Sequence, residues 1–281
     1  MLINGREIAA GIAEDLQIKI AELKQHEIIA KLAVALVGKD LGSEKYVEQK
    51  VKLGLRLGIK VAVSRLENSA KTESLISLVN WWNKDPAIHG IIIQRPIPLK
   101  IESNELNNLP ARKKDVDGFH PQSLFDPPIV LAVMKILENI YRLSHDNNDL
   151  LKWLAEKKIL IIGRGETAGR PIAKYLTKNK LPFTVAHSGT GDLKQLTLTS
   201  DIIISAVGKP NIVRHDMISE KTVLIGVGLH PENDHLATDY NQEEIAGKAL
   251  FYTPVPGGVG PVNVAMLMEN VIIAAEKSIQ R

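Results

Sequence analysis

Short apolar runs alternate with amphipathic segments along the whole chain, and this alternation constrains the fold more than any other feature. Residues 31–38 form a continuous apolar run that ends in glycine, and further short segments rich in apolar residues, which we expect to be strands, occupy residues 60–66, 88–96, 157–163, 183–187, 201–208, 222–228 and 249–255. Segments with helical periodicity include residues 6–25, 42–58, 71–83, 129–142 and 264–279. A strand that is apolar at every position is buried on both faces, and such strands, joined by helices, form parallel sheets with right-handed crossovers. The sequence therefore predicts an α/β fold.

The chain is too long for one small domain. Its 281 residues exceed the roughly 100–200 residues of a typical domain, and we expect two αβ lobes with a cleft between them. We assign residues 1–142 and 264–281 to the first domain and residues 143–263 to the second, which we expect to be a Rossmann-type nucleotide-binding domain. The segment 96–128, rich in proline, is expected to be a long ordered loop.

Composition excludes several classes of protein. The chain has no cysteine, so disulfides, thiolate zinc sites and cysteine nucleophiles are absent. A net charge of +3 with 4% aromatic residues does not indicate nucleic-acid binding. The apolar runs are far shorter than the roughly 20 residues of a spanning helix, and the N-terminal segment carries acids unlike a targeting peptide, so we expect a cytoplasmic protein that does not bind membranes.

A glycine-rich turn after the strand at 157–163 predicts a nucleotide site. Gly163, Gly165 and Gly169 lie between this strand and a helix, where close backbone approach and a helix N-terminus suit a phosphate. The spacing is one residue longer than the usual dinucleotide pattern, and a turn without a ligand is the alternative. We assign Val207 and Gly208, at the end of a later strand, to the same site.

The strand after this turn indicates which cofactor binds. An NAD site ends that strand with an acid, whereas this chain has His187 and Ser188 there. Arg164 and Arg170 could pair with a 2′-phosphate, so NADP is favoured over NAD. The alternative is that both arginines are ordinary solvated side chains.

Three further segments carry polar groups that could act on a ligand. Tyr46 and Lys50 are four residues apart on a predicted helix and share a face, although from spacing alone an exposed lysine is the more frequent arrangement. Gln94 ends a buried strand, and Asp115 and Asp117 flank Val116 in the proline-rich segment. These acids favour hydrogen bonds to a ligand over a metal, because the segment supplies too few metal ligands.

The glycine- and proline-rich segment 253–263 can place backbone N–H groups against a ligand. Together these segments resemble the bifunctional methylenetetrahydrofolate dehydrogenase/methenyltetrahydrofolate cyclohydrolase family from end to end. The resemblance rests on the motifs YVEQK, GIIIQRPIP, KDVDGFHP, GRGETAGRP, HSGT and TPVPGGVGP, which occur in this order.

The resemblance implies the roles of individual residues. It makes Lys50 the key catalytic group, with Tyr46 orienting the folate, Gln94 supporting the lysine and Asp117 binding the pteridine. Residues Pro256, Gly257 and Gly258 are implied to contact substrate. The nucleotide motifs map to Gly163, Arg164, Gly165, Gly169, His187 and Ser188. The first domain then becomes the folate-binding catalytic domain.

The activity implied is the interconversion of 5,10-methylene-, 5,10-methenyl- and 10-formyltetrahydrofolate in one-carbon metabolism and purine biosynthesis. An NADP-dependent hydride transfer is followed by hydrolysis of the methenyl cation, and a homodimer through the nucleotide lobes is implied. The chain departs from the family pattern mostly in the nucleotide half, at Gly165, Ala168, Ile129, Val130, Gly226, Val262 and Asn263. Three alternatives stay open: an enzyme that is mainly a cyclohydrolase, a binding protein without turnover, and an unrelated Rossmann oxidoreductase.

Overall fold

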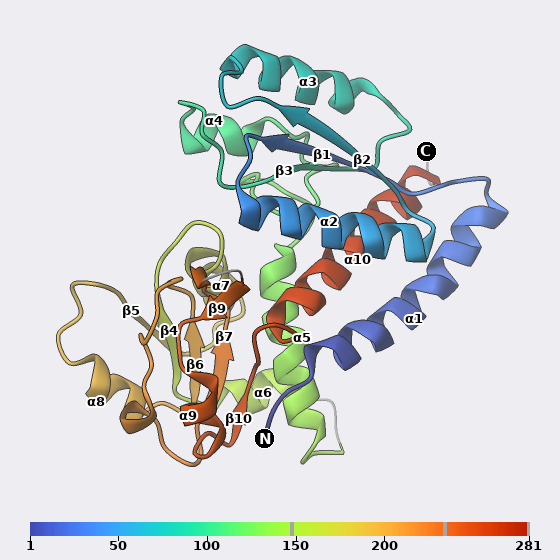
Figure 1. Cartoon of the computed structure of the whole chain (residues 1–281). Coiled ribbons are helices and arrows are strands. Elements are labelled where there is room, and N and C mark those ends of the chain that lie inside the picture. Colours follow the sequence, from blue (N-terminus) through green and yellow to red (C-terminus); the bar gives the residue numbers. More distant parts are fainter. Residues whose placement is uncertain (147–148, 233–234, 280–281) are drawn as a thin grey trace. The chain divides into compact units, whose positions relative to one another are not determined.

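The computed structural model describes residues 1–146, 149–232 and 235–279 (Figure 1). The chain divides into two compact units. We call residues 10–128 with 264–281 the N-terminal unit, and residues 1–9 with 129–263 the C-terminal unit. This grouping differs from the predicted domains at two places, residues 1–9 and residues 129–142, which both group with the nucleotide half.

Contacts within the C-terminal unit explain the difference. The backbone N–H of Ile3 donates to Tyr252 O at 2.8 Å and that of Tyr252 donates to Met1 O at 3.1 Å, so the first residues extend the sheet beside a late strand. Near the end of the helix at 128–142, the Tyr141 ring stacks on His145 with 4.2 Å between centroids and lies 5.6 Å from that of Trp153.

The N-terminal unit contains a three-stranded parallel sheet with the order β2-β1-β3. Its strands are β1 (Lys31–Val37), β2 (Lys60–Leu66) and β3 (Gly90–Ile93), and its helices include α1 (Gly5–Gln25, from residue 10 on), α2 (Leu41–Leu57), α3 (Thr72–Lys84) and α4 (Ser103–Asn108). Figure 1 shows α2 and α3 on opposite faces of this sheet. Alternate residues of β1 face the core beneath α3, namely Ala33, Ala35 and Val37, which cluster with Leu75, Val79 and Trp82. The three predicted strands are confirmed.

The C-terminal unit contains a five-stranded parallel sheet with the order β10-β7-β6-β4-β5. Its strands are β4 (Ile159–Ile162), β5 (Phe183–Ala186), β6 (Ile202–Ser205), β7 (Val223–Gly226) and β10 (Phe251–Tyr252). Its helices are α5 (Pro128–Arg142, from residue 129), α6 (Leu150–Ala155), α7 (Gly169–Lys178), α8 (Leu193–Leu198) and α9 (Gln242–Ala246), with a 3-10 turn η1 (His215–Met217). An antiparallel pair, β8 (Leu229–Glu232) and β9 (His235–Thr238), completes the unit. The strand order reverses between β4 and β6, where open α/β sheets bind ligands.

Two expectations about local structure were wrong. The proline-rich segment was predicted to be a loop throughout, but it contains α4, a short polar helix without apolar periodicity. The last helix, α10 (Val259–Ile279), begins at Val259 and not at 264, so the glycine-rich loop ends at Gly258. Pro261 occupies the first turn of this helix, where its missing N–H has no intrahelical partner to lose.

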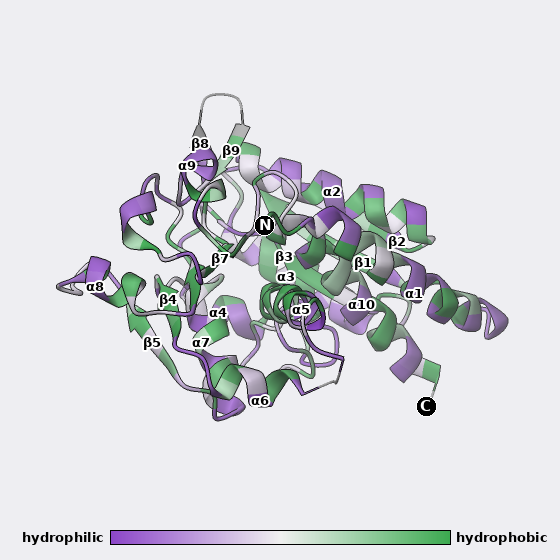
Figure 2. Ribbon diagram, turned by 90° about the horizontal axis from the view of Figure 1, so that it is seen from below, coloured by the Kyte–Doolittle hydropathy of each residue, from purple (hydrophilic) through white to green (hydrophobic). Residues whose placement is uncertain are grey.

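Helix α10 also bears on the expectation that the chain holds no spanning segment. By length and composition alone it could cross a bilayer, because its 18-residue window has a mean hydropathy of 1.3. However, 67% of that window is buried, as in the core helix of a globular domain. In Figure 2, α1 and α2 instead alternate between hydrophilic and hydrophobic colours along their lengths, as amphipathic helices do.

Candidate active site

Helix α2 positions the predicted tyrosine and lysine. Asp40 caps its N-terminus by accepting from Ser43 N at 2.7 Å, and Gly58 ends it with a φ of +81°. The buried residues of α2 recur at helical spacing: Ser43, Val47, Lys50, Gly54 and Leu57. Lys50 therefore lies on the inward face, with 6% of its surface exposed, and Tyr46 is half-buried. The exposed-lysine alternative is wrong.

The Lys50 amine has a neutral partner. Its Nζ donates to Gln94 Oε1 at 2.7 Å, and Gln94 Nε2 donates to Arg95 O at 2.9 Å. Ser43 Oγ donates to the same carbonyl at 3.2 Å. The amide of Gln94, which directly follows β3, is thus fixed with its oxygen toward the lysine. The predicted support of Lys50 by Gln94 has the required geometry.

The two aspartates lie on a segment that pairs with β3 at the edge of the sheet. Residue 115 forms a parallel bridge with Ile91 of β3, and Ile91 N donates to Lys114 O at 2.7 Å. From α10, Asn270 Nδ2 donates to Val116 O at 2.9 Å. Gly118 has a φ of +74°, and a Cβ there would lie 2.7 Å from Pro127 N, so the motif requires glycine at this position.

Lys114, which precedes the aspartates, anchors this segment to α3. Its buried Nζ donates to Trp82 O at 2.9 Å and to Asp85 O at 2.6 Å, at the carboxyl end of the helix. A cation is favourable there because the last carbonyls of a helix carry partial negative charge. Contacts with β3, α10 and α3 therefore fix the segment that carries the two aspartates.

Electrostatics couple Lys50 to Asp117. Burial lowers the pKa of Lys50, and the charge of Asp117 opposes this shift. Burial likewise raises the pKa of Asp117, while Lys50 and Arg95 oppose the rise. The two groups, 67 positions apart in the sequence, therefore act on one another within the N-terminal unit. A lysine with a lowered pKa can give up and accept a proton near neutral pH.

Burial also raises the pKa values of Asp115 and Tyr46. Burial raises the pKa of Asp115 to about 6, against hydrogen bonds from His120 and Ser123 that lower it. His120 N donates to Asp115 Oδ2 at 2.8 Å, so Asp115 shapes the loop after Gly118. Burial raises the pKa of Tyr46 to about 12, so its hydroxyl stays protonated and is a hydrogen-bond donor at neutral pH.

Sequence reasoning missed Arg95, Asn107 and Phe119, which surround this cluster. The Arg95 guanidinium lies 4.1 Å from the centroid of the Phe119 ring and donates to Asn107 Oδ1. Arg95 follows Gln94 directly, but nothing in the sequence pattern indicated that its charge would act on Asp117. The predicted residues Tyr46, Lys50, Gln94 and Asp117 all belong to the N-terminal unit.

In the C-terminal unit, the glycine-rich turn follows β4 as predicted. Gly163 has a φ of +105°, and a Cβ on Gly169 would lie 2.2 Å from Gly163 O. A Cβ on Gly165 would meet nothing within 4 Å, so that position is open. The turn leads into α7, whose ten residues present a helix N-terminus to the switch point of the sheet. A turn of this geometry before a helix N-terminus permits the close approach of a phosphate.

The loop after β5 contains the predicted His187 and Ser188. His187 N donates to Thr190 Oγ1 at 2.9 Å and Thr190 N donates to His187 O at 2.8 Å, which closes a tight turn. Both His187 and Ser188 are exposed, as are Arg164 and Arg170. Within the described part of the chain, neither arginine has a carboxylate partner.

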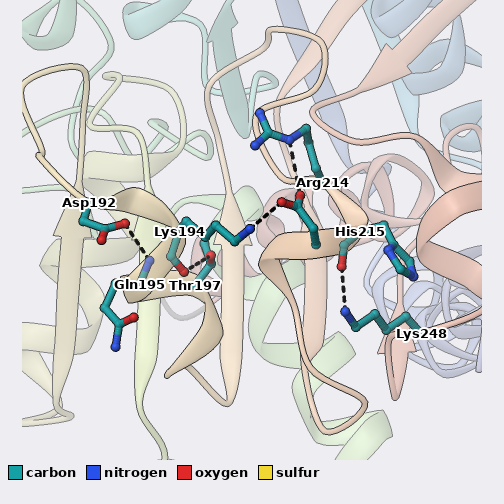
Figure 3. Close-up of polar contacts among 8 residues, drawn as sticks. Asp192, Lys194, Gln195, Thr197, Arg214, His215 and Lys248 are labelled. Carbon is teal, nitrogen blue, oxygen red and sulfur yellow. Dashed lines mark hydrogen bonds and ion pairs between the residues drawn. The ribbon is translucent and has the colours of Figure 1, made fainter.

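Three other basic side chains of this unit have polar partners. Lys194 Nζ lies 2.6 Å from Asp216 Oδ2, Arg214 Nε lies 3.4 Å from Asp216 Oδ1, and Lys248 Nζ donates to His215 O at 3.0 Å (Figure 3). This cluster joins α8 to η1. Lys194 and Arg214 thus share the carboxylate of Asp216, whereas neither Arg164 nor Arg170 has a carboxylate partner among the described residues.

The turn after β6 contains the predicted Val207 and Gly208, but their backbone N–H groups already have an acceptor. Val207 N donates to Asp239 Oδ2 at 2.9 Å and Gly208 N donates to Asp239 Oδ1 at 2.7 Å. The N–H groups of these two residues are therefore not available to a ligand. Asp239 was missed because it lies more than 30 positions along the chain from the turn.

The predicted substrate loop Pro256–Gly258 belongs to the C-terminal unit. Gln242 holds its start, since Val255 N donates to Gln242 Oε1 at 2.9 Å and Gln242 Nε2 donates to Val255 O at 2.7 Å. Gly257 has a φ of +104°, and a Cβ on Gly258 would lie 2.4 Å from Pro254 O. Both glycines are therefore required by the loop itself.

The departure at Gly226 has a structural counterpart. A Cβ at this position would lie 2.4 Å from Thr238 Oγ1 and 2.7 Å from Tyr240 Oη. The Tyr240 hydroxyl donates to Thr253 O at 2.5 Å. Thr238 and Tyr240 thus fill the space that a side chain at position 226 would need.

Two family models match the chain. The catalytic domain of tetrahydrofolate dehydrogenase/cyclohydrolase matches residues 3–117, and the NAD(P)-binding domain of the same family matches residues 133–279. Among curated proteins, the bifunctional protein FolD of Campylobacter concisus is 34% identical over 290 residues, covering 100% of this chain and 99% of the relative.

Solved structures agree with the family models. The structure of the bifunctional FolD dehydrogenase/cyclohydrolase from Campylobacter jejuni has a TM-score of 0.88 at 35% identity and covers 99% of each chain. The Trypanosoma brucei N5,N10-methylenetetrahydrofolate dehydrogenase-cyclohydrolase, solved with NADP cofactor and inhibitor, has a TM-score of 0.89 at 29% identity, covering 100% of this chain and 99% of that one. The resemblance stated from the motifs is confirmed.

Proposed function

Because this chain belongs to the tetrahydrofolate dehydrogenase/cyclohydrolase family, we propose that it interconverts 5,10-methylene-, 5,10-methenyl- and 10-formyltetrahydrofolate, with NADP as the oxidant. One observation carries the proposal more than any other. Lys50 is buried in the N-terminal unit with its Nζ held 2.7 Å from Gln94 Oε1 and its charge coupled to Asp117. Binding alone does not require such a lysine, which argues against a protein without turnover.

The residues of the N-terminal unit perform the proton chemistry. Water attacks the methenyl carbon, and the Lys50 amine, whose pKa burial lowers, accepts the proton that the water loses. The same amine then returns a proton to N5 as the bond between N5 and the former methenyl carbon breaks, which opens the ring and leaves the formyl group on N10. Gln94 orients the amine without adding charge, and Asp117 accepts hydrogen bonds from the amino and ring N–H groups of the pterin.

The C-terminal unit has the features of a nucleotide site. The turn from Gly163 to Gly169 can cradle a diphosphate, and Arg164, exposed and without an acidic partner among the described residues, suits a 2′-phosphate. NADP⁺, when bound, accepts the hydride of the methylene carbon. No acid follows β5, which supports NADP over NAD. The turn departs from the family pattern at Gly165 and Ala168 but keeps the close approach of Gly163 and Gly169, which favours both activities over a cyclohydrolase alone.

We also propose a homodimer and a cytoplasmic location, with a place in purine biosynthesis. The family resemblance supports these three proposals.

The test of the proposed function is Lys50→Met, which removes the amine and keeps the length of the side chain. The rate of methenyltetrahydrofolate hydrolysis is measured by the decrease in its absorbance. We expect this rate to fall about a hundredfold or more, as for the loss of a general acid–base group. Affinity for NADP⁺ should not change, because Lys50 lies outside the nucleotide motifs. Lys45→Met, an exposed lysine of the same helix, is the matched control. Unchanged hydrolysis in Lys50→Met would refute the role of the lysine.

A further inference from the structure

Among the described residues of the C-terminal unit, Asp239 is the carboxylate with the most hydrogen bonds. It directly follows β9 and is fully buried. Its carboxylate accepts from Ser205 Oγ at 2.6 Å, Val207 N at 2.9 Å, Gly208 N at 2.7 Å and Lys209 N at 3.0 Å. Its carbonyl accepts from Ile212 N at 2.8 Å and from Val213 N at 3.2 Å. One residue thus holds both ends of the segment 205–213.

The three successive N–H groups of residues 207–209 form an anion-binding nest. Such concave arrangements of backbone N–H groups commonly bind phosphates. In this chain the anion comes from the protein, and glycines make room for it. A Cβ on Gly228 would lie 2.4 Å from Asp239 Oδ2, and a Cβ on Gly208, whose φ is +73°, would lie 2.8 Å from Leu229 O.

The nest stands beside the phosphate-binding turn. Residues 206–209 follow β6, and Gly163 follows β4, which is its neighbour in the sheet. A Cβ on Gly163 would lie 2.5 Å from Ala206 O, so the two turns are in contact. The position of the second turn therefore limits the room that a nucleotide has at the first.

We propose that Asp239 is a positioning residue of the nucleotide site. Its carboxylate fills the nest that a ligand phosphate would otherwise occupy, and it fixes the 206–209 turn as a rigid wall against which the nucleotide binds. The diphosphate is thereby confined to the turn at residues 163–169. This inference rests on the proposed function, because it assigns the nucleotide to the same switch point.

The test uses Asp239→Asn and Asp239→Ala in the full chain. We expect the Kd for NADP⁺, measured by calorimetry, to rise about tenfold in both variants, since a turn that is correctly placed in only about a tenth of the molecules weakens binding by that factor. Hydrolysis of methenyltetrahydrofolate should stay within about twofold of wild type, because it needs no nucleotide. Asp201→Asn, which removes a carboxylate that accepts a single backbone N–H from Lys158 at 2.8 Å, is the matched control and should bind normally.

A rescue separates positioning from a general structural role. Added sodium formate supplies a small carboxylate that fits the nest vacated in Asp239→Ala, and we expect it to restore most of the NADP⁺ affinity, whereas sodium chloride at equal ionic strength should restore less. If Asp239→Ala does not fold, Asp239→Asn alone decides the proposal. An unchanged Kd in Asp239→Asn, or folded Asp239→Ala without any response to formate, would overturn it. Wild-type protein that binds NADP⁺ without any turnover would overturn the proposed function instead, and the affinity comparison would still decide the role of Asp239.

Discussion

Replacing Gln94 with glutamate should change the pH at which the hydration step works. The substitution keeps an oxygen near the Lys50 Nζ, now 2.7 Å from Gln94 Oε1, but gives it a negative charge. A hydrogen bond to a charged group contributes about 1.5–3 kcal/mol, against about 0.5–1.5 kcal/mol for a neutral one. The protonated amine is therefore favoured by about 1.5 kcal/mol more than in the wild type, which raises the pKa of Lys50 by about one unit.

This shift has a defined kinetic consequence. At any pH well below the pKa of Lys50, the fraction of neutral amine falls about tenfold per unit by which the pKa rises. Hydrolysis of methenyltetrahydrofolate at neutral pH should thus slow by about tenfold in Gln94→Glu, and the acidic limb of its pH profile should move up by about one unit.

The assay is the loss of methenyltetrahydrofolate absorbance at a series of pH values, corrected for the uncatalysed reaction in the same buffers. Gln49→Glu is the matched control, because Gln49 is exposed on the same helix and receives the same added charge next to Lys50 in the sequence. Its profile should match that of the wild type. A Gln94→Glu profile that keeps its wild-type midpoint, at any overall rate, would show that the Lys50–Gln94 contact does not set the working pH.

Two further predictions concern the cofactor preference and the pH dependence of the stability of the protein. Arg164→Ala should lower the preference for NADP⁺ over NAD⁺, measured as the ratio of the two kcat/KM values, by about tenfold or more, because a charged contact to the 2′-phosphate is lost. The control is Arg214→Ala, which removes an exposed arginine already paired with Asp216 and should leave the ratio unchanged. An unchanged ratio in Arg164→Ala would exclude Arg164 from contact with the 2′-phosphate. Burial raises the pKa of Asp115 from 3.8 to about 6 in the folded protein. Its contribution to the free energy of unfolding is therefore complete below about pH 4 and is lost as the pH rises through 6, a decrease of about 3 kcal/mol. Urea unfolding at several pH values should show the stability of the wild type falling relative to Asp115→Asn over this range; parallel pH dependence in both proteins would contradict the raised pKa.

The strands and the main helices could be predicted because their information is local. Strand β4 is apolar at every position, and β1 and β6 are apolar except for Lys31 and Ser205 at their ends, a pattern that marks a strand covered on both faces. The helix α4 was missed because its sequence SNELNN has only one buried apolar residue, Leu106, and is held by contacts from distant segments. The start of α10 was placed too late because glycine and proline in its first turn are typical of a loop.

The site residues also fall into those that a local pattern predicted and those that depend on contacts between distant segments. Tyr46 and Lys50 are separated by one helical turn, so spacing alone placed them on one face, but only the fold shows that this face is buried. Arg95 and Asp239 act on groups that are distant in sequence or not identifiable by any local pattern. Contacts of that kind depend on which loops the sheet order brings together, and the motifs indicate them only through the family resemblance.

The segment that carries Asp115 and Asp117 has a second consequence. Strand β3 lies at the edge of its sheet, it is entirely apolar and buried, and the pairing with residues 114–116 is what covers its outer side. An uncovered strand of this kind offers unpaired backbone groups to another molecule and promotes aggregation. The segment proposed to hold the pterin therefore also protects the solubility of the fold, and variants that detach this segment should lose activity and precipitate together.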